Sequence, residues 1–379
     1  MSAHRIIFVS PYDPRDIRKW SGTIYSLYQA LIASDASVIY LSGGLLDLGA
    51  RVVNKLCERW FKLDCRFSTA YAVLGGVYFT VRLALAGDAV IVAVAASNYL
   101  PYVATRKSII YISDATFSTI QDLYPSFRAF PRWLQAQGDR NEAISLRKAR
   151  FVLYPSRWAA DSARIHYDVP ADRITEIPFG PNIPADLIEA KFATKRPIAE
   201  NGITLLFVTT DWERKNGELV AEVCQRLVDR GVVKLRLILI GEAPDRVVRL
   251  PFIDAWGRLS KTDPAQMARL CQAYAEAHLL LLPTRAEAFG VVFSEAQAFG
   301  VPSITYDVGG TGSAVVQGET GILLPLSADA MTFAAAIEQC VGDPDLYEAM
   351  SLRCRERYLR HANWTAWADL ISRLAQISA

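Results

Sequence analysis

Residues 278–307, HLLLLPTRAEAFGVVFSEAQAFGVPSITYD, contain the pattern from which the fold class is predicted. This stretch opens with a leucine run that ends near Thr284, continues through a short loop and becomes helical near Gly290. A second β-branched run, PSITYD, follows the helical segment. A short, continuously apolar run is typical of a strand that helices cover on both faces. The stretch therefore predicts a strand–helix–strand unit of an α/β fold.

The same alternation runs through both halves of the chain. The strand-like segments are RIIFVS, SVIYLSG, DAVIVAV, SIIYISD, FVLYPS and ITEIP in the first half, and ITLLFVTT, LRLILIG, HLLLLPT, PSITYD and GILLP in the second. Between the halves, residues 178–202 contain four prolines and no clear periodicity, which indicates a linker. We therefore predict two Rossmann-like, doubly wound parallel-sheet domains in tandem.

The predicted domain boundaries follow from this alternation. We expect an N-terminal domain at residues 1–185, a linker at 186–202 and a C-terminal domain at 203–355. Residues 356–379 are predicted to form an amphipathic helix that packs back on the N-terminal domain. Ligands of such sheets bind beyond the carboxyl ends of the strands, so functional residues are expected in the loops that follow strands.

Composition narrows the functional class. The chain has 379 residues, of which 51% are hydrophobic and 21% charged, with a formal net charge of +2; these values are typical of a globular enzyme. No basic stripe is dense enough for nucleic-acid binding. The six cysteines show no metal-ligand spacing, which fits a reducing cytoplasm. The longest apolar run, residues 71–81, is too short to cross a bilayer, and the N-terminus lacks a signal-peptide pattern.

The expected location is therefore the cytoplasm, with the protein either soluble or lying on the inner face of a membrane. Two basic, aromatic-containing segments, residues 51–66 with Trp60 and Phe61 and residues 127–150, can either meet anionic lipid headgroups or place their aromatic rings in the core.

The loop and helix after the leucine run contain two carboxylates, Glu287 and Glu295, on either side of the pair Phe289–Gly290. Gly290 permits close approach of a ligand, and the free backbone N–H groups of Gly290, Val291 and Val292 suit an anion such as a diphosphate. A carboxylate one turn further into the helix can accept hydrogen bonds from a ribose diol. The alternative is a helix-entry acid favoured by the helix dipole together with a surface acid.

A basic pair follows the first strand of the second half. Arg214 and Lys215 lie in the loop TTDWERKNG, at the edge of the sheet where they can neutralise phosphates, although such a pair can also be a solvated loop. The glycine-rich run VGGTGSAV, residues 308–315, follows another strand and can line a pocket with backbone amides or serve only as a turn.

These segments together resemble the family 4 glycosyltransferases of the GT-B fold. The resemblance depends on the E-x7-E spacing of Glu287 and Glu295, the preceding LLLLPT, the following FGVP and GETGILLP, and the segment FVTTDWERKNG. It is nearly continuous over residues 151–325, where YPSRWAADSARIHYDVPADRITEIPFGPN also matches.

The resemblance implies roles for the matching residues. Glu287 would contact the transferred sugar, Glu295 the nucleotide ribose and Lys215 the diphosphate. The family usually has an arginine five or six residues before this lysine, where the chain has Thr209 and Thr210, so Arg214 would substitute from the neighbouring position. Phe289, Gly290 and Val291 complete the expected donor site.

The first half contributes a second set of expected site residues. Ser21, Gly22 and Thr23 match the family's first loop beside the donor phosphates and acceptor, where Ser21 can cap the following helix. Many family members have a His-Asp pair after a strand of this half, whereas this chain has Ser113 and Asp114. Asp114 can bind a sugar hydroxyl and act in catalysis, or it can cap a helix beginning at Ala115 or Thr116.

The sequence thus predicts a retaining glycosyltransferase that uses a UDP- or GDP-linked sugar and a glycan or lipid-linked acceptor. No cofactor or metal is expected, because the one D-x-D string, Asp343 to Asp345, matches a helix N-cap followed by proline. Two alternatives stay open: a nucleotide-sugar epimerase of the same fold, and a non-catalytic sugar-nucleotide-binding subunit.

Overall fold

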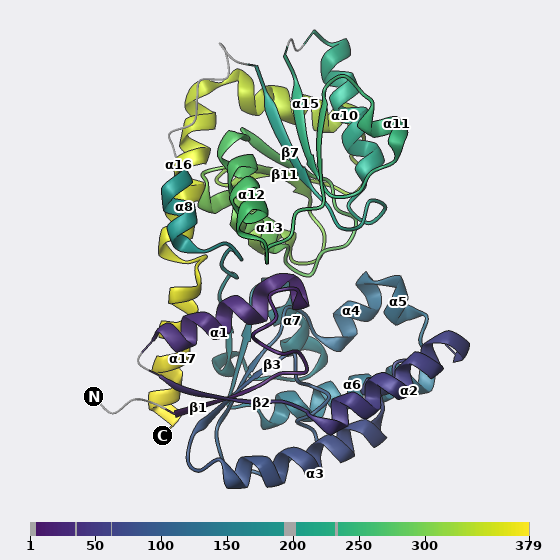
Figure 1. Cartoon of the computed structure of the whole chain (residues 1–379), viewed down its shortest axis with the longest axis vertical. Helices are drawn as coiled ribbons and strands as arrows, with labels where there is room; N and C mark the ends of the chain where they lie inside the picture. Colours follow the sequence, from purple (N-terminus) through teal and green to yellow (C-terminus); the bar gives the residue numbers. More distant parts are fainter. Residues whose placement is uncertain (1–4, 35, 62, 193–201, 232–233, 379) are drawn as a thin grey trace. The chain divides into compact units, whose positions relative to one another are not determined.

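The computed structural model describes residues 5–34, 36–61, 63–192, 202–231 and 234–378 (Figure 1). Within α2 the side chains of residues 45, 56 and 58–61 are not described either. The two alternatives for Trp60 and Phe61, contact with lipid headgroups or packing in the core, therefore lie outside the described residues. The chain divides into two compact units. Unit 1 comprises Met1–Ile177 and Trp364–Ala379, and unit 2 comprises Pro178–Asn363.

Unit 1 is built on a six-stranded parallel sheet in the order β2-β1-β3-β4-β5-β6. Its strands are β1 (Arg5–Val9), β2 (Ser37–Leu41), β3 (Val90–Val94), β4 (Ile109–Ile112), β5 (Phe151–Tyr154) and β6 (Ile174–Glu176). The central strands β1, β3 and β4 are almost wholly apolar and buried, because helices cover both faces of the sheet.

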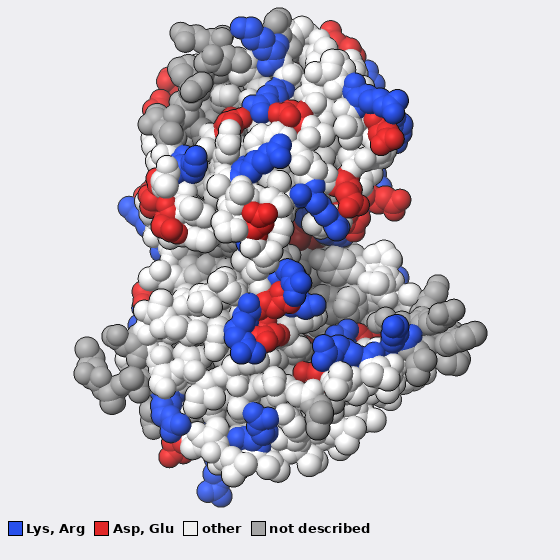
Figure 2. All heavy atoms as spheres, viewed as in Figure 1, with Lys and Arg blue, Asp and Glu red and all other residues white. Residues whose placement is uncertain are grey.

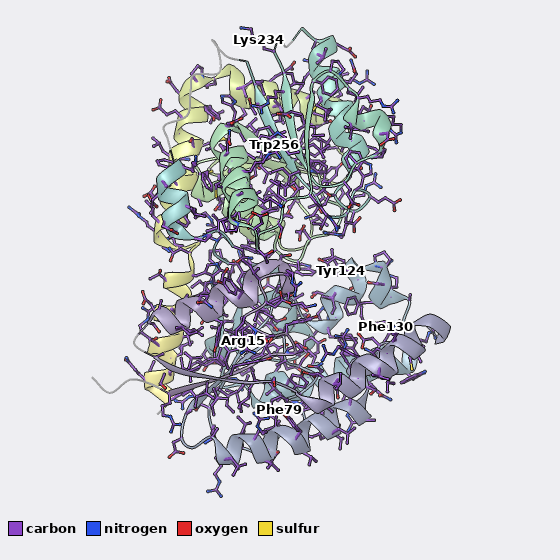
Figure 3. The ribbon with its side chains drawn as sticks, in the orientation of Figure 1. Arg15, Phe79, Tyr124, Phe130, Lys234 and Trp256 are labelled. Carbon is purple, nitrogen blue, oxygen red and sulfur yellow. The ribbon has the colours of Figure 1, made fainter. Side chains whose placement is uncertain are left out.

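The helices of unit 1 form two layers on this sheet. They are α1 (Thr23–Ala33), α2 (Leu45–Phe61), α3 (Thr69–Leu85), α4 (Phe117–Leu123), α5 (Pro125–Arg128), α6 (Arg132–Lys148), α7 (Arg157–His166) and α17 (Trp364–Ser378). Helices α2, α3, α6 and α7 share one core with alternate residues of the strands, and Phe79 of α3, labelled in Figure 3, is a buried member of it. The ring of Phe8, which points to the opposite face, packs on Tyr28 of α1.

Unit 2 repeats this architecture with the strand order β12-β11-β10-β7-β8-β9, again all parallel. The strands are β7 (Thr204–Val208), β8 (Arg236–Ile240), β9 (Ile253–Gly257), β10 (Leu279–Leu282), β11 (Ser303–Tyr306) and β12 (Gly321–Leu324). The helices are α8 (Ala185–Lys191), α10 (Gly217–Asp229), α11 (Asp245–Val248), α12 (Pro264–Glu276), α13 (Val291–Ala298), α14 (Thr311–Ala314), α15 (Ala330–Gly342) and α16 (Pro344–Arg360). The prediction of two parallel-sheet domains is confirmed.

The structure places the unit boundaries elsewhere than the sequence suggested. Unit 2 already begins at Pro178, because the ring of Phe179 packs on Phe289 and its carbonyl accepts a 2.7 Å hydrogen bond from Ser294 Oγ. Much of the first part of the expected linker is helix α8, which packs beside α12. Residues 193–201 of the expected linker lie outside the described residues.

The end of the chain also differs in detail from the expectation. The segment expected at 356–379 is divided, since α16 belongs to unit 2 and only α17 belongs to unit 1. Asp343 caps α16, with Pro344 in the first turn, as the sequence indicated. Helix α17 packs beside α1, and the side chains of Trp367 and Ile371 are fully buried.

One carboxyl group is buried inside unit 1. Glu142 of α6 is 2% exposed, and the hydroxyl of Tyr111 on β4 donates to its Oε1 at 3.0 Å. Burial raises the pKa of Glu142 from 4.5 to about 7. The folded protein therefore favours the protonated carboxyl.

We predict that this raised pKa makes the stability of unit 1 depend on pH. The contribution of Glu142 is fully present below pH 4.5 and is lost as the pH rises to about 7, because only the unfolded chain ionises in that window. Relative to a Glu142→Gln variant, the wild type should lose about 3 kcal/mol of unfolding free energy across this range. Urea unfolding at a series of pH values measures the difference, with the exposed Glu319→Gln as control. A wild-type-to-variant difference that does not vary with pH would contradict the prediction.

Candidate functional site

The predicted site residues of unit 2 lie at the carboxyl edge of its sheet. Strand β10 ends at Leu282, the loop 283–290 follows, and α13 begins at Val291. The loop is fastened to the turn after β11, because the backbone N–H of Gly310 donates to the carbonyl of Glu287 at 3.0 Å. Two neighbouring strands thus hold Glu287 in place.

Gly290 ends this loop in a conformation that favours glycine. Its φ is +87°, in the left-handed region. A Cβ atom here would lie 2.6 Å from the ring of Phe293 and 3.0 Å from Cγ of Glu287. The absence of a side chain therefore lets the first turn of α13 lie close to Glu287.

Lys215 reaches Glu287 from the loop after β7, and the two form an ion pair. The Lys215 side chain is 9% exposed and that of Glu287 12%. Arg214 joins them, since its Nη1 lies 3.3 Å from Glu287 Oε2 and donates to the carbonyl of Ala286 at 2.8 Å. The structure thus brings the expected sugar-binding acid and the expected phosphate-binding cations into direct contact.

Arg214 and Lys215 place two positive charges beside Glu287, where both could contact an anion. Desolvation lowers the pKa of the Lys215 ammonium below its ordinary 10.5, and the negative charge of Glu287 opposes this shift. Asp211 partly balances Arg214 from its exposed side, at 3.3 Å. Thr209, one of the two positions where the resemblance leads one to expect an arginine, is buried and accepts a hydrogen bond from the N–H of Asp211.

Glu295 lies in the second turn of α13, and its side chain is 5% exposed. Its Oε1 forms an ion pair with Lys261, and its Oε2 accepts a 2.8 Å hydrogen bond from the hydroxyl of Tyr274. Burial, with Glu295 nearby, raises the pKa of Tyr274 well above its ordinary value, so this hydroxyl remains a donor. Both carboxylate oxygens thus have a fixed partner.

Sequence reasoning missed Lys261 and Tyr274. Lys261 lies in the segment between β9 and α12, so the rule that functional residues follow strands was a usable signal for it. Tyr274 lies inside α12 and contacts Glu295 through the tertiary fold, for which the local sequence gives no signal.

In unit 1 the expected loop 21–23 has an unusual backbone. Trp20, Ser21 and Gly22 have φ angles of 48°, 56° and 91°, all in the left-handed region. The expectation that Ser21 caps α1 is wrong, because the left-handed turn makes Gly22 the N-cap and Thr23 the first helical residue. Non-glycine residues are held in such conformations mainly at turns and functional sites.

Asp114 follows β4 at the carboxyl edge of the same sheet and is partly buried. It does not cap α4. Thr116 does so instead, in a reciprocal arrangement with Thr119: the Thr119 N–H donates to Thr116 Oγ1 at 3.3 Å, and the Thr116 N–H donates to Thr119 Oγ1 at 3.0 Å. Of the two roles considered for Asp114, the capping role is thereby removed.

A cavity of about 690 Å³ opens near the carboxyl ends of β1 and β2 in unit 1. Its lining includes four basic residues, Arg15, Lys19, Arg51 and Arg66, and three acids, Asp13, Asp16 and Asp47. Arg15, labelled in Figure 3, pairs with Asp13 at 2.8 Å. Over the described part of the chain, no three His, Cys, Asp or Glu side chains form a group that could hold a metal ion.

Known proteins resemble this chain in sequence and in fold. Residues 189–357 match the family described as Glycosyl transferases group 1. A D-inositol 3-phosphate glycosyltransferase of Nocardia farcinica is 28% identical over 254 residues, which are 62% of this chain and 55% of that protein. The chain spans about half the length of the curated relatives that it matches.

Two solved structures show the same fold. A sucrose-phosphate synthase from Thermosynechococcus elongatus has a TM-score of 0.67 at 18% identity, and the match covers 99% of this chain and 98% of that one. Anabaena HepE in complex with UDP has a TM-score of 0.64 at 15% identity, with 98% and 100% covered. The predicted GT-B fold is confirmed, and the match over residues 189–357 supports the predicted resemblance to the group 1 glycosyltransferases.

We predict that Gly290→Ala destabilises unit 2. An alanine must adopt a positive φ and also displace Phe293 or Glu287, which should cost more than about 1 kcal/mol of unfolding free energy. Gly342→Ala is the matched control, because nothing lies within 4 Å of its added Cβ. Equal unfolding midpoints in urea for the two variants would refute this account of Gly290.

Proposed function

Because residues 189–357 form a group 1 glycosyltransferase domain within a GT-B fold, we propose that this protein is a retaining glycosyltransferase. It transfers a sugar from a nucleoside diphosphate donor to a glycan or glycolipid acceptor. The observation that carries the proposal is the cluster of buried Lys215 with partly buried Arg214 and Glu287 beside the first turn of α13.

In this proposal the donor diphosphate takes the place of Glu287 as the partner of Lys215. A diphosphate has more negative charge than one carboxylate, and the N-terminus of α13 adds backbone N–H donors and the positive end of the helix dipole. Glu287, released from the lysine, then binds hydroxyls of the transferred sugar. The HepE structure is a complex with UDP, which supports a nucleoside diphosphate as the ligand class.

Glu295 is proposed to hold the nucleotide ribose. A vicinal diol offers two hydroxyl donors, and the partly exposed Lys261 can move aside while Tyr274 keeps the carboxylate oriented. Fixing the ribose and the diphosphate at separate points of α13 would set the position of the anomeric carbon.

The main catalytic effect proposed is stabilisation of the departing diphosphate. Lys215, Arg214 and the backbone N–H groups at the start of α13 are donors aimed at the place where negative charge develops as the glycosidic bond breaks. These groups supply the positive charge needed there, so we propose a reaction that requires no divalent cation.

The acceptor is proposed to bind in unit 1, near Ser21 to Thr23, Asp114 and the cavity beside Arg15. The basic residues that line this cavity suit an acceptor that carries phosphate or carboxylate. The curated relatives support this class, since their name specifies an inositol phosphate. Asp114 would then bind an acceptor hydroxyl. We place this activity in the cytoplasm.

We predict that Lys215→Met weakens nucleoside diphosphate binding by about ten- to a hundredfold, because a hydrogen bond between charged groups contributes about 1.5–3 kcal/mol. Titration calorimetry with UDP and with GDP measures the loss. Lys191→Met, an exposed lysine of α8, should bind as the wild type does. Binding should also weaken at alkaline pH, since the pKa of Lys215 lies below 10.5. Unchanged affinity in Lys215→Met would overturn the proposed diphosphate site.

We predict that Glu287→Gln abolishes sugar transfer while nucleoside diphosphate binding persists. The variant keeps the shape of the side chain but loses the charged acceptor that grips the sugar. Transfer is followed by mass spectrometry of acceptor mixtures with UDP- or GDP-sugars. Undiminished turnover in Glu287→Gln would contradict the proposal that Glu287 binds the transferred sugar. Isomerisation of the donor alone would identify an epimerase, and donor binding without any turnover of the wild type would identify a binding subunit.

A further inference from the structure

Helix α3 of unit 1 presents an aliphatic stripe to solvent. The stripe consists of Val73, Leu74, Val77, Val81 and Leu85. These positions recur at the spacing of one helix face. Leu74, Val77 and Leu85 are 60%, 63% and 80% exposed. Single exposed aliphatic residues are common on proteins, whereas a continuous stripe of them marks a surface that contacts something else.

The stripe cannot turn inward, because the opposite face of α3 is already packed. Phe79 and Leu83 are each 1% exposed in the core of unit 1. At Gly76 the helix backbone lies so close to the segment 99–102 that an added Cβ would be 2.5 Å from Cβ of Tyr102. The rotation of α3 is therefore fixed, and the stripe remains on the surface.

The helices on either side of α3 are basic. Both α2 and α6 pack beside α3. Apart from Arg51, which lines the cavity beside Arg15, their exposed basic residues are Lys55, Arg132, Arg140, Arg147 and Lys148. Among the described side chains of α2, α3 and α6, no carboxylate is exposed: Asp47 and Asp139 are partly buried, and Glu142 is buried. In Figure 2 the surface along α3 is largely free of charged residues.

We propose that this three-helix face of unit 1 docks on an anionic phospholipid bilayer, with the α3 stripe inserted among the lipids and the basic residues of α2 and α6 on the headgroups. An apolar stripe with positive flanks is the composition that such an interface attracts. At 17 residues, α3 is about 25 Å long, which suits a helix that lies in the plane of the interface. Trp133 of α6, 52% exposed, adds an aromatic ring of the kind enriched at headgroup depth.

The charges favour a bilayer over a second copy of the chain. A twofold dimer through this face would bring the same patch of both copies together, so the basic flanks would face one another. That pairing repels, whereas a surface of phospholipid phosphates attracts the same residues. No helix among the described residues is long and apolar enough to cross a membrane. The proposed contact is therefore one in which the three-helix face lies on the bilayer surface.

Sedimentation of the full chain with phospholipid vesicles tests the proposal. The wild type should pellet with vesicles of phosphatidylcholine and phosphatidylglycerol, and much less with phosphatidylcholine alone. Leu74→Ser combined with Val77→Ser should weaken binding at least about tenfold, because the inserted aliphatic groups are lost. Arg140→Gln combined with Arg147→Gln should weaken binding to anionic vesicles by about fivefold per charge and reduce its sensitivity to salt.

Controls come from unit 2. Leu352→Ser combined with Leu359→Ser removes two aliphatic residues of similar exposure from α16 and should leave vesicle binding unchanged. UDP and GDP binding without lipid should be the same in all these variants, so failure of the donor site and failure of the lipid surface give different results. The proposal is overturned if the wild type does not pellet or if the stripe variant pellets equally well. It is also overturned if the wild type ignores vesicles but forms a dimer that the stripe variant lacks.

Discussion

The largely buried ion pair between Lys215 and Glu287 is the constraint on which the site in unit 2 depends. Burying either charge alone is strongly unfavourable, so the loops after β7 and β10 must keep the two groups together. Backbone hydrogen bonds reinforce this arrangement, since the N–H of Arg285 donates to the carbonyl of Arg214 at 2.9 Å and Gly310 donates to Glu287. These contacts join three loops that are far apart in the sequence. A ligand that separates Lys215 from Glu287 must therefore carry charge that replaces the lost partner.

The sequence predicted well those features that depend on local pattern. The leucine run of β10 and the start of α13 at Gly290 lie where apolar periodicity and glycine chemistry indicate, and Asp343 with Pro344 caps α16 as the dipeptide predicts. The parallel sheets follow from the repetition of such units. Because the carboxyl ends of parallel strands share one edge, the loops containing Glu287 and Lys215 could be assigned to one site from the sequence alone.

Features that depend on packing at a distance were not predictable. The ion pair between Lys261 and Glu295 joins residues 34 positions apart, and nothing near either residue indicates the other. The predicted helix caps were wrong for a different reason. Ser21 and Asp114 are both good capping residues by type, but the left-handed turn at Trp20 to Gly22 moves the start of α1. At α4 the side chains of Thr116 and Thr119 each accept a hydrogen bond from the backbone N–H of the other. Residue type limits where a cap can lie, and backbone geometry decides which residue provides it.

The division of unit 1 between the two ends of the chain has a consequence for synthesis. Unit 2 is continuous, so all of its strands and helices have been made by the time Asn363 is added. Unit 1 lacks α17 until residues 364–378 are translated, and the core beneath Trp367 and Ile371 stays open to solvent until then. The usual order, in which the N-terminal domain is completed first, is thus reversed for the final packing step. A ribosome that stops before Trp364 would release a chain with a complete second unit and an unfinished first one.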